Sequence, residues 1–427
     1  MKRVESCLPE CEALINERRR DIAPPELRSA VAGIVQAVRS RGDAALCEYT
    51  STFDKVALKP AQIRLSDDEW DVAIEPGLEK ALKKAIASVR AYHEQQKRPD
   101  WFAQRDDGGY VGEVYRPVDR AGLYVPAGTA PLVSTVVMTV VPAQMAGVRE
   151  ICVASPPRAD GKVNPGILAA CRLCGITEIY RMGGAQAVAA LAFGTKSVRR
   201  VDVIAGPGNA YVTEAKRQVY GYVGIDLIAG PSESLIIADA SADPAYVAAD
   251  ILSQAEHHGS STYLVCDSGL LLDRVEAHIA TLLSTTLADA ELKKAVAGRL
   301  VAIHVKSLDE AADVANLIAP EHLQIMTGDD AAVLKRIRHA GAVFLGAYSP
   351  VPLGDFVAGP SHVLPTGATA RYMSGLSTEV FRKRMSVMNF SAEGFADVAE
   401  AIETIARYEE LPAHEHAAAV RRAHTRK

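Results

Sequence analysis

The sequence predicts an α/β protein with two Rossmann-like parallel-sheet domains and helical segments at both ends. Between residues 150 and 345, short apolar segments that favour strands alternate with longer amphipathic segments that favour helices. Such alternation is typical of parallel sheets covered by helices. In the first hundred residues, apolar positions recur at three-to-four spacing, which indicates helices. Because the predicted strands are so numerous, two similar domains are favoured over one sheet.

The individual elements follow from the same periodicities. Strands are expected at residues 150–154, 178–182, 201–205, 235–238, 263–266, 300–304 and 342–345. Helices are expected at residues 9–19, 24–40, 67–96, 165–174, 185–192, 210–220, 244–255, 270–287 and 309–318. A short β segment at residues 112–118 precedes a turn rich in Gly and Pro. The last helix, residues 392–407, leads into a tail rich in Ala, His and Arg.

These elements divide the chain into four segments. A helical segment covers residues 1–110, and the two Rossmann-like domains cover residues 111–235 and 236–375. A helical tail covers residues 376–427. The chain length allows each predicted domain its own apolar core.

Composition narrows the classes of partner and the compartment. The 427 residues carry a formal net charge of -5, which argues against nucleic acid or an anionic membrane as the main partner. The N-terminus is charged where a signal peptide is apolar, and the longest apolar run, residues 133–148, contains Ser, Thr, Pro and Gln. We therefore expect a cytoplasmic protein. The seven cysteines are scattered, and Cys171 and Cys174 are interpreted as small buried residues rather than metal ligands.

Three loops of small residues follow predicted strands or apolar stretches. They are residues 183–186 (Gly-Gly-Ala-Gln), 206–209 (Gly-Pro-Gly-Asn) and 229–233 (Ala-Gly-Pro-Ser-Glu). Ligands of open parallel sheets gather where strands pass into helices, and glycine lets the backbone approach a ligand. None of the three loops is a standard dinucleotide or phosphate fingerprint, and a loop of this kind taken alone is more often an ordinary tight turn than a ligand site.

Several polar residues could carry chemistry, and each also has a structural explanation. Gln254 and His257 share one face at the end of a predicted helix, where His can instead stabilise the last carbonyls. Glu321 and His322 follow Pro320 and could divide acid and base work, or lie in a solvated turn.

Two further segments combine carboxylates and imidazoles. Asp355 and His362 lie in a long loop rich in Gly and Pro, where an Asx turn is the commoner role for Asp. His414 and His416 alternate near the C-terminus beside Glu409, so that only one of the two imidazoles could join a given site; a solvated tail is the alternative.

Taken in order, these segments resemble the histidinol dehydrogenase family. The resemblance runs from about residue 114 to residue 414. Its most specific motifs are LYVP at 123–126 with TAPL at 129–132, GGAQA at 183–187, GPGN at 206–209 with VTEAK at 212–216, AGPSE at 229–233, SQAEH at 253–257 and PEHL at 320–323, with HVLPT at 362–366 in support.

The resemblance implies a cofactor set and a division of roles. It implies one zinc ion per subunit and NAD, in an intertwined homodimer whose C-terminal segment contributes to the partner's active site. The implied metal ligands are Gln254, His257, Asp355 and His414, and the implied acid/base pair is Glu321 and His322. The implied NAD contacts are Tyr124, Gln186 and Asn209. The implied substrate contacts are Ser232, Gln254, His257, His322, Asp355, His362, Glu409 and His414.

The implied reaction is a four-electron oxidation of a primary alcohol to a carboxylate through an aldehyde, with L-histidinol as the small-molecule substrate. Two positions depart from the family pattern: Val351 replaces a carboxylate and Phe356 replaces a phenol. Losing a charged partner for an ammonium group weakens the case for histidinol. The alternative is a paralogue that oxidises another primary alcohol, such as a dihydroxypropanesulfonate, and a protein without catalytic activity is a third hypothesis.

Overall fold

The chain forms two compact units in a computed structural model that describes residues 2–5, 23–70, 72–128, 130–257 and 259–425. Unit 1 comprises Met1–Gln96 and Val118–Phe381, and unit 2 comprises Lys97–Pro117 and Arg382–Lys427. Both parallel sheets belong to unit 1. The predicted boundary between residues 235 and 236 therefore falls inside one of its strands. No helix among the described residues is long and apolar enough to cross a membrane.

The first sheet of unit 1 has five parallel strands in the order β6-β5-β4-β7-β8. The strands are β4 (Arg120–Tyr124), β5 (Glu150–Ser155), β6 (Ile179–Arg181), β7 (Val203–Ala205) and β8 (Gly224–Ile225). The direction in which successive strands are added reverses between β4 and β7. Such a reversal separates the two flanking loops and leaves a crevice at the strand ends.

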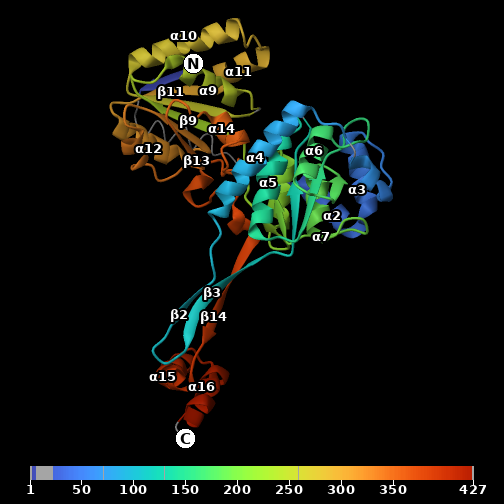
Figure 1. Ribbon diagram of the computed structural model, residues 1–427, viewed down its shortest axis with the longest axis vertical. Coiled ribbons are helices and arrows are strands. Elements are labelled where there is room, and N and C mark those ends of the chain that lie inside the picture. Colours follow the sequence, from blue (N-terminus) through green and yellow to red (C-terminus); the bar gives the residue numbers. More distant parts are fainter. Residues whose placement is uncertain (1, 6–22, 71, 129, 258, 426–427) are drawn as a thin grey trace. The chain divides into compact units, whose positions relative to one another are not determined.

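Helices cover both faces of this sheet, so that its strands are buried on both sides (Figure 1). One face packs against α4 (Pro76–Glu94), α5 (Val133–Ala146) and α6 (Pro165–Leu173). The other packs against α2 (Pro25–Arg41), α3 (Asp43–Tyr49), α7 (Gly184–Phe193) and α8 (Ala210–Val219). Cys171 and Cys174 are buried in the first of these layers, which confirms their interpretation as core residues.

The second sheet repeats the same order with one strand added at an edge: β1-β11-β10-β9-β12-β13, all parallel. Its strands are β1 (Lys2–Glu5), β9 (Glu233–Ala238), β10 (Ser261–Cys266), β11 (Leu300–His304), β12 (His322–Met326) and β13 (Ala342–Leu345). Along β9, Leu235 and Ile237 face the layer that contains α12 (Leu308–Ile318) and α13 (Asp330–Leu334). Ile236 and Ala238 face α9 (Pro244–Ala255), α10 (Gly269–Ser284) and α11 (Ala290–Arg299).

Unit 2 is a three-stranded antiparallel sheet with two helices (Figure 1). Its elements are β2 (Trp101–Gln104), β3 (Tyr110–Pro117), β14 (Arg382–Asn389), α15 (Ala392–Tyr408) and α16 (Pro412–Thr425). The helices are joined by an ion pair between Arg422 and Glu403 at 2.6 Å. The helix at residues 392–407 was predicted as the last one, and this prediction is wrong, because α16 follows it; the segment predicted as a helical tail also contains the strand β14.

Several other elements differ from the prediction. The strand β1 lies in a segment predicted to be helical, and α5 occupies the long apolar run that was assigned no structure. Residues 67–96 hold a short 3₁₀ turn and then α4, because Pro76 begins the helix there. The predicted helix at residues 9–19 lies outside the described residues.

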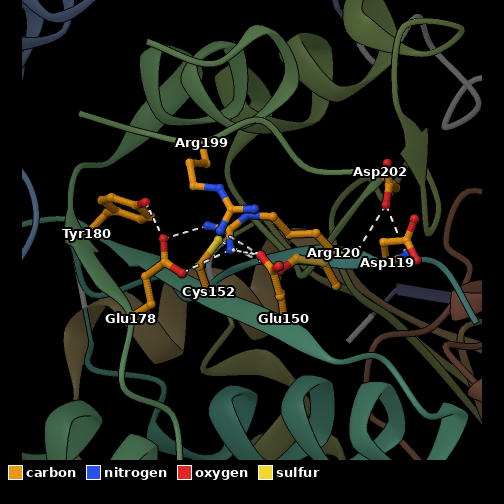
Figure 2. Close-up of polar contacts among 9 residues, drawn as sticks. Asp119, Arg120, Glu150, Cys152, Glu178, Tyr180, Arg199 and Asp202 are labelled. Carbon is orange, nitrogen blue, oxygen red and sulfur yellow. Dashed lines mark hydrogen bonds and ion pairs between the residues drawn. The ribbon is translucent and has the colours of Figure 1, made fainter. Parts of the chain in front are cut away.

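A network of charges joins the amino ends of the first sheet's strands (Figure 2). The Arg120 guanidinium, at the start of β4, donates to Glu150 at 3.0 Å and to Glu178 at 2.9 Å. Tyr180 also donates to Glu178, and Arg199 pairs with Glu150. The side chain of Arg120 is 5% exposed, whereas that of Arg199 is 69% exposed. The buried guanidinium therefore ties together the segments that begin β4, β5 and β6.

Replacing this guanidinium should destabilise unit 1. In Arg120→Met, Glu178 would keep a largely buried charge without its partner, so we expect the free energy of unfolding to fall by about 3 kcal/mol. Denaturant unfolding followed by circular dichroism measures the change. Arg199→Met is the control, and we expect little change there because its guanidinium is solvated. Equal stability of the two variants would contradict a structural role for the buried pair.

Candidate functional site

The Glu321-His322 pair lies at the amino end of β12, beside the amino end of β9. The parallel register pairs His322 with Ser234. Upstream, α12 ends at Ala319, whose φ of 50° is left-handed, and Pro320 then prevents the helix from continuing. The chain therefore turns sharply and enters β12 with both polar side chains buried.

The main chain of Glu233 holds both side chains. Its N–H donates to Oε2 of Glu321 at 3.0 Å, and its carbonyl accepts from Nδ1 of His322 at 3.2 Å. Because a carbonyl can only accept, Nδ1 carries the proton and Nε2 presents a lone pair. That Nε2 is buried and has no hydrogen-bond partner, and Oδ1 of Asp355 lies 3.8 Å from it.

Burial sets the protonation of the pair. It raises the pKa of Glu321 to about 8, although hydrogen bonds from Glu233 and Ser232 oppose the shift. Burial also lowers the pKa of His322, against the attraction of Asp355. At neutral pH the carboxyl group is therefore poised near its titration point and the imidazole is neutral.

Asp355 lies on α14 (Val351–Phe356), a short helix and not the loop that was predicted. Pro352 fits its first turn, where no main-chain donor is needed, so proline does not exclude a helix here. The Asp355 carbonyl accepts from Nδ1 of His362 at 3.0 Å, and Nε2 of His362 accepts from the Thr135 hydroxyl at 3.1 Å. Burial lowers the pKa of His362 to about 4, so this ring is neutral and fixed by two hydrogen bonds.

Gln254 is the last-but-one residue of α9, and His257 lies just beyond the helix. The N–H of His257 donates to the Gln254 carbonyl at 3.2 Å, in a tighter, 3₁₀-type turn. Side chains three residues apart in such a turn lie one above the other, so the turn is compatible with the predicted shared face. The amide of Gln254 is buried, and neither its oxygen nor its nitrogen has a partner. An unpaired buried amide is costly, so a ligand that pairs with it is favoured.

A metal ion needs several donor atoms close together. Within the described ranges, no three His, Cys, Asp or Glu side chains gather in a metal-binding cluster. The three ligands predicted in unit 1, Gln254, His257 and Asp355, carry oxygen and nitrogen donors, which are of the kinds that bind zinc. The orphaned Gln254 amide is the observation that supports this fit.

A cavity of about 190 Å³ lies beside the acid/base pair. His322, Asp355 and His362 line it together with Phe344 and Leu364. Neither Val351 nor Phe356 is among its lining residues: Val351 is buried and Phe356 is half exposed. The two departures from the family pattern therefore do not fall on the walls of this cavity.

A larger cavity, about 750 Å³, brings together the three predicted cofactor residues. Tyr124 ends β4, Gln186 lies in the first turn of α7, and Asn209 caps α8. The Tyr124 hydroxyl accepts from the N–H of Gly184 at 3.1 Å. His257 also lines this cavity, which lies where the strand order reverses between β4 and β7.

The loop between β7 and α8 is fixed close to Tyr124. Gly206 has a φ of 122°, and a Cβ there would collide with the Tyr124 carbonyl. Its N–H donates to Asp226 at 2.7 Å, and its carbonyl accepts from Lys216 at 3.0 Å. Glycine is therefore required at this position by both backbone angle and space.

Glu409 and His414 belong to unit 2. Glu409 ends α15, and His414 lies in the first turn of α16 after Glu410, whose φ of 57° turns the chain. All other residues predicted for the site belong to unit 1.

Three further groups contribute to the site or its cavities and were not predicted from the sequence. Thr135 orients His362, the main chain of Glu233 orients the acid/base pair, and Asp54 lines the larger cavity. Asp54 ends a π-helical turn, Thr50–Asp54, outside the alternating region where ligand loops were sought. The motif AGPSE did contain Glu233, but its contribution comes from main-chain atoms and leaves no side-chain signal.

Known proteins resemble this chain in sequence and in fold. Residues 17–422 match the family described as histidinol dehydrogenase. A histidinol dehydrogenase of Heliobacterium mobile is 47% identical over 395 residues, covering 92% of each chain, and one of Bacillus subtilis is 44% identical, covering 94% of this chain and 95% of its own. A crystal structure of histidinol dehydrogenase from Elizabethkingia anophelis has a TM-score of 0.93 at 35% identity, covering 100% of this chain and 99% of its own.

The chain belongs to the histidinol dehydrogenase family. The predicted resemblance is thereby confirmed, and with it an oxidoreductase and an α/β fold with parallel sheets. A catalytically inactive protein loses its support, because this histidinol dehydrogenase family member keeps a buried Glu321-His322 pair beside a cavity.

The buried carboxyl of Asp54 should make stability depend on pH. Burial raises its pKa from 3.8 to about 6, so between these values the folded state binds more protons than the unfolded state. This group therefore lowers stability as the pH rises through that window. We expect Asp54→Asn to raise the melting temperature of the ligand-free protein at pH 7.5, with the gain shrinking towards pH 4. A gain independent of pH would contradict this origin.

Proposed function

We propose that this enzyme oxidises L-histidinol to L-histidine in two successive NAD-linked steps at a zinc-containing site. The observation that carries the proposal is the buried Glu321-His322 pair, held by the main chain of Glu233 with Nε2 of His322 free. Membership of the histidinol dehydrogenase family supports the choice of substrate.

Zinc would be held by Gln254, His257 and Asp355 of one chain, with His414 supplied by a second copy of the chain. When bound, the ion would supply a positive centre that orients and polarises the substrate's oxygen. Two observations support this assignment: the buried amide of Gln254 has no hydrogen-bond partner, and the carboxylate of Asp355 lies 3.8 Å from the neutral His322 ring.

His322 acts as the base in the first step. Its Nδ1 proton is fixed on the Glu233 carbonyl, so Nε2 accepts the proton of the substrate's hydroxyl as the carbon loses hydride. A depressed pKa keeps this nitrogen unprotonated at neutral pH. The fixed ring also removes the need to reorient during the reaction.

Glu321 serves the second step, in which water adds to the aldehyde. A carboxyl whose pKa is about 8 exchanges protons readily near neutral pH, and Glu321 accepts a proton from the attacking water. Its buried position limits access of bulk water, so the aldehyde is retained between the two oxidations.

NAD would occupy the larger cavity and accept the hydride of each step. Tyr124, Gln186 and Asn209 are the residues we assign to its binding, and the orphaned amide of Gln186 supports this. The strand order reverses at this cavity, as in Rossmann-like nucleotide sites, although the fingerprint glycine motif is absent.

The substrate would contact Ser232, His322, Asp355 and His362 of one chain, as well as the metal ligands Gln254 and His257. A second copy of the chain would supply Glu409 and His414. The carboxylates of Asp355 and Glu409 suit a substrate that carries an ammonium group. A sulfonate substrate has no comparable support, since Val351 and Phe356 line neither cavity.

A homodimer with shared sites completes the proposal. Unit 2 is small, yet it exposes many large apolar side chains, which indicates a surface that a partner covers. They are Trp101, Phe102, Val111, Met385, Met388, Phe390, Ile402, Ile405, Tyr408 and Leu411. A second copy of the chain is the partner we propose, because the same unit carries Glu409 and His414.

Substitutions of the two proposed catalytic side chains should impair different steps of the reaction. We expect His322→Asn to lower kcat for L-histidinol about 10³-fold because the base is lost. Glu321→Gln should impair oxidation of L-histidinal more than formation of the aldehyde. Stopped-flow NADH absorbance with each substrate measures both steps, and metal analysis checks that zinc is retained.

The exposed residues His278 and Glu291 provide matched controls. His278→Asn and Glu291→Gln should leave both rates unchanged. Full activity of His322→Asn with either substrate would remove this residue from the mechanism.

Shared sites predict complementation between two inactive variants. When His322→Asn and His414→Ala chains are co-expressed, each heterodimer has one site with both residues intact. Random pairing should then restore about one quarter of the wild-type activity, whereas each variant alone stays inactive.

Light scattering of the mixture verifies that it is dimeric. If each site used the His414 of its own chain, the mixture would remain as inactive as its components, and sharing would be excluded.

A further inference from the structure

Asp54 reaches the larger cavity from outside the sheet. It ends the turn Thr50–Asp54 that follows α3, and Lys55 then adopts a left-handed φ of 60° that redirects the chain. Its carboxylate lines the cavity together with Tyr124, Gln186 and Pro156. The N-terminal segment thus supplies a charged group to a cavity whose other walls come mainly from the sheet loops.

This carboxylate lies at the carboxyl ends of β5 and β6. A Cβ on Gly183, two residues after the end of β6, would lie 3.5 Å from Oδ1 of Asp54 and 2.6 Å from Cβ of Pro156, which directly follows β5. In sheets whose strand order reverses, an acidic residue beside the second strand hydrogen-bonds the ribose hydroxyls of a dinucleotide. Here β5 is followed by Pro156 and Pro157, which offer no acid. Asp54 supplies the missing carboxylate from another segment.

The buried carboxylate oxygen of Asp54 has no hydrogen-bond partner. Oδ2 of Asp54 makes no hydrogen bond, and burial raises the pKa of the group to about 6. A buried acceptor that lacks a donor is costly, and a diol would supply two donors. The carboxylate is therefore suited to a ligand with neighbouring hydroxyl groups.

The charged side chains that line the cavity disfavour a phosphate group beside Asp54. Glu256 is a second acidic lining residue, and none of the lining residues that the structure describes is Lys or Arg. A 2′-phosphate would add about two negative charges close to a carboxylate, with no lysine or arginine among these residues to offset them.

We propose that Asp54 binds the adenosine ribose hydroxyls of the dinucleotide and thereby makes the enzyme select NAD over NADP. This inference rests on the proposed NAD-linked function and assigns a specificity-determining residue to it.

Calorimetric titration of the full-length protein with NAD, NADP and 2′-deoxy-NAD tests this assignment. Wild type should bind NAD at least about tenfold more tightly than either analogue, as expected for a hydrogen bond to a charged group. In Asp54→Asn we expect NAD affinity to fall about tenfold and the ratio of NAD to 2′-deoxy-NAD affinity to approach one. NADP affinity should rise because the like charge is gone.

Two controls separate binding from folding. Glu48→Gln removes an exposed carboxylate of α3 that is paired with Arg41 outside the cavity, and it should leave all three affinities unchanged. Asp54→Glu keeps the charge and should retain discrimination against NADP. A purely structural role of Asp54 would shift the melting temperature without changing the ratios between nucleotides.

The same measurements distinguish the role of Asp54 from the proposed NAD-linked function. If wild type binds NAD and oxidises L-histidinol while Asp54→Asn keeps the wild-type ratios, the role of Asp54 is overturned and the proposed function stands. If wild type binds none of the three nucleotides, the NAD-linked function itself fails, and the inference fails with it.

Discussion

The parallel pairing of β9 with β12 is the constraint on which the chemistry depends. It sets the main chain of Glu233 beside Glu321 and His322, so that one residue's N–H and carbonyl fix both side chains. A shift of one residue in this register would turn the His322 side chain to the opposite face of the sheet. The core residues Leu323 and Ile325 prevent such a shift, because they would leave the apolar layer at the same time.

The two parallel sheets share one strand order, but the residues assigned to function lie at opposite ends of their strands. In the first sheet, Tyr124 and Gly206 lie at the carboxyl ends of strands, where open α/β sheets usually bind ligands. In the second sheet, Glu321 and His322 lie at the amino ends of strands. In the first sheet, the amino ends of the strands are instead occupied by the network of charged side chains around Arg120. The fold therefore does not itself decide which end carries the chemistry; the loops and their polar residues decide it.

The sequence predicted elements well where periodicity and end signals agree. The helix Pro244–Ala255 and the strand Leu300–His304 were predicted with their observed bounds, because capping residues and apolar runs mark them. Periodicity could not reveal α14, which is only one and a half turns long and contains Pro352 and Gly354. The site residues came from family motifs, which carry side-chain identity but not main-chain roles such as that of Glu233, or contributions from unrelated segments such as that of Asp54.

The ligand-free fold carries the energetic cost of buried polar atoms without partners, and ligands that pair with these atoms would offset it. The side-chain amides of Gln186 and Gln254, Nε2 of His322 and Oδ2 of Asp54 are all buried without partners. Each such group costs about 1–3 kcal/mol, so the four together amount to a substantial fraction of the stability of an ordinary domain. A ligand that pairs with them binds only the folded state and stabilises it. The same unpaired atoms therefore make the empty site less stable and the occupied site selective, because a ligand without matching groups would leave them unpaired.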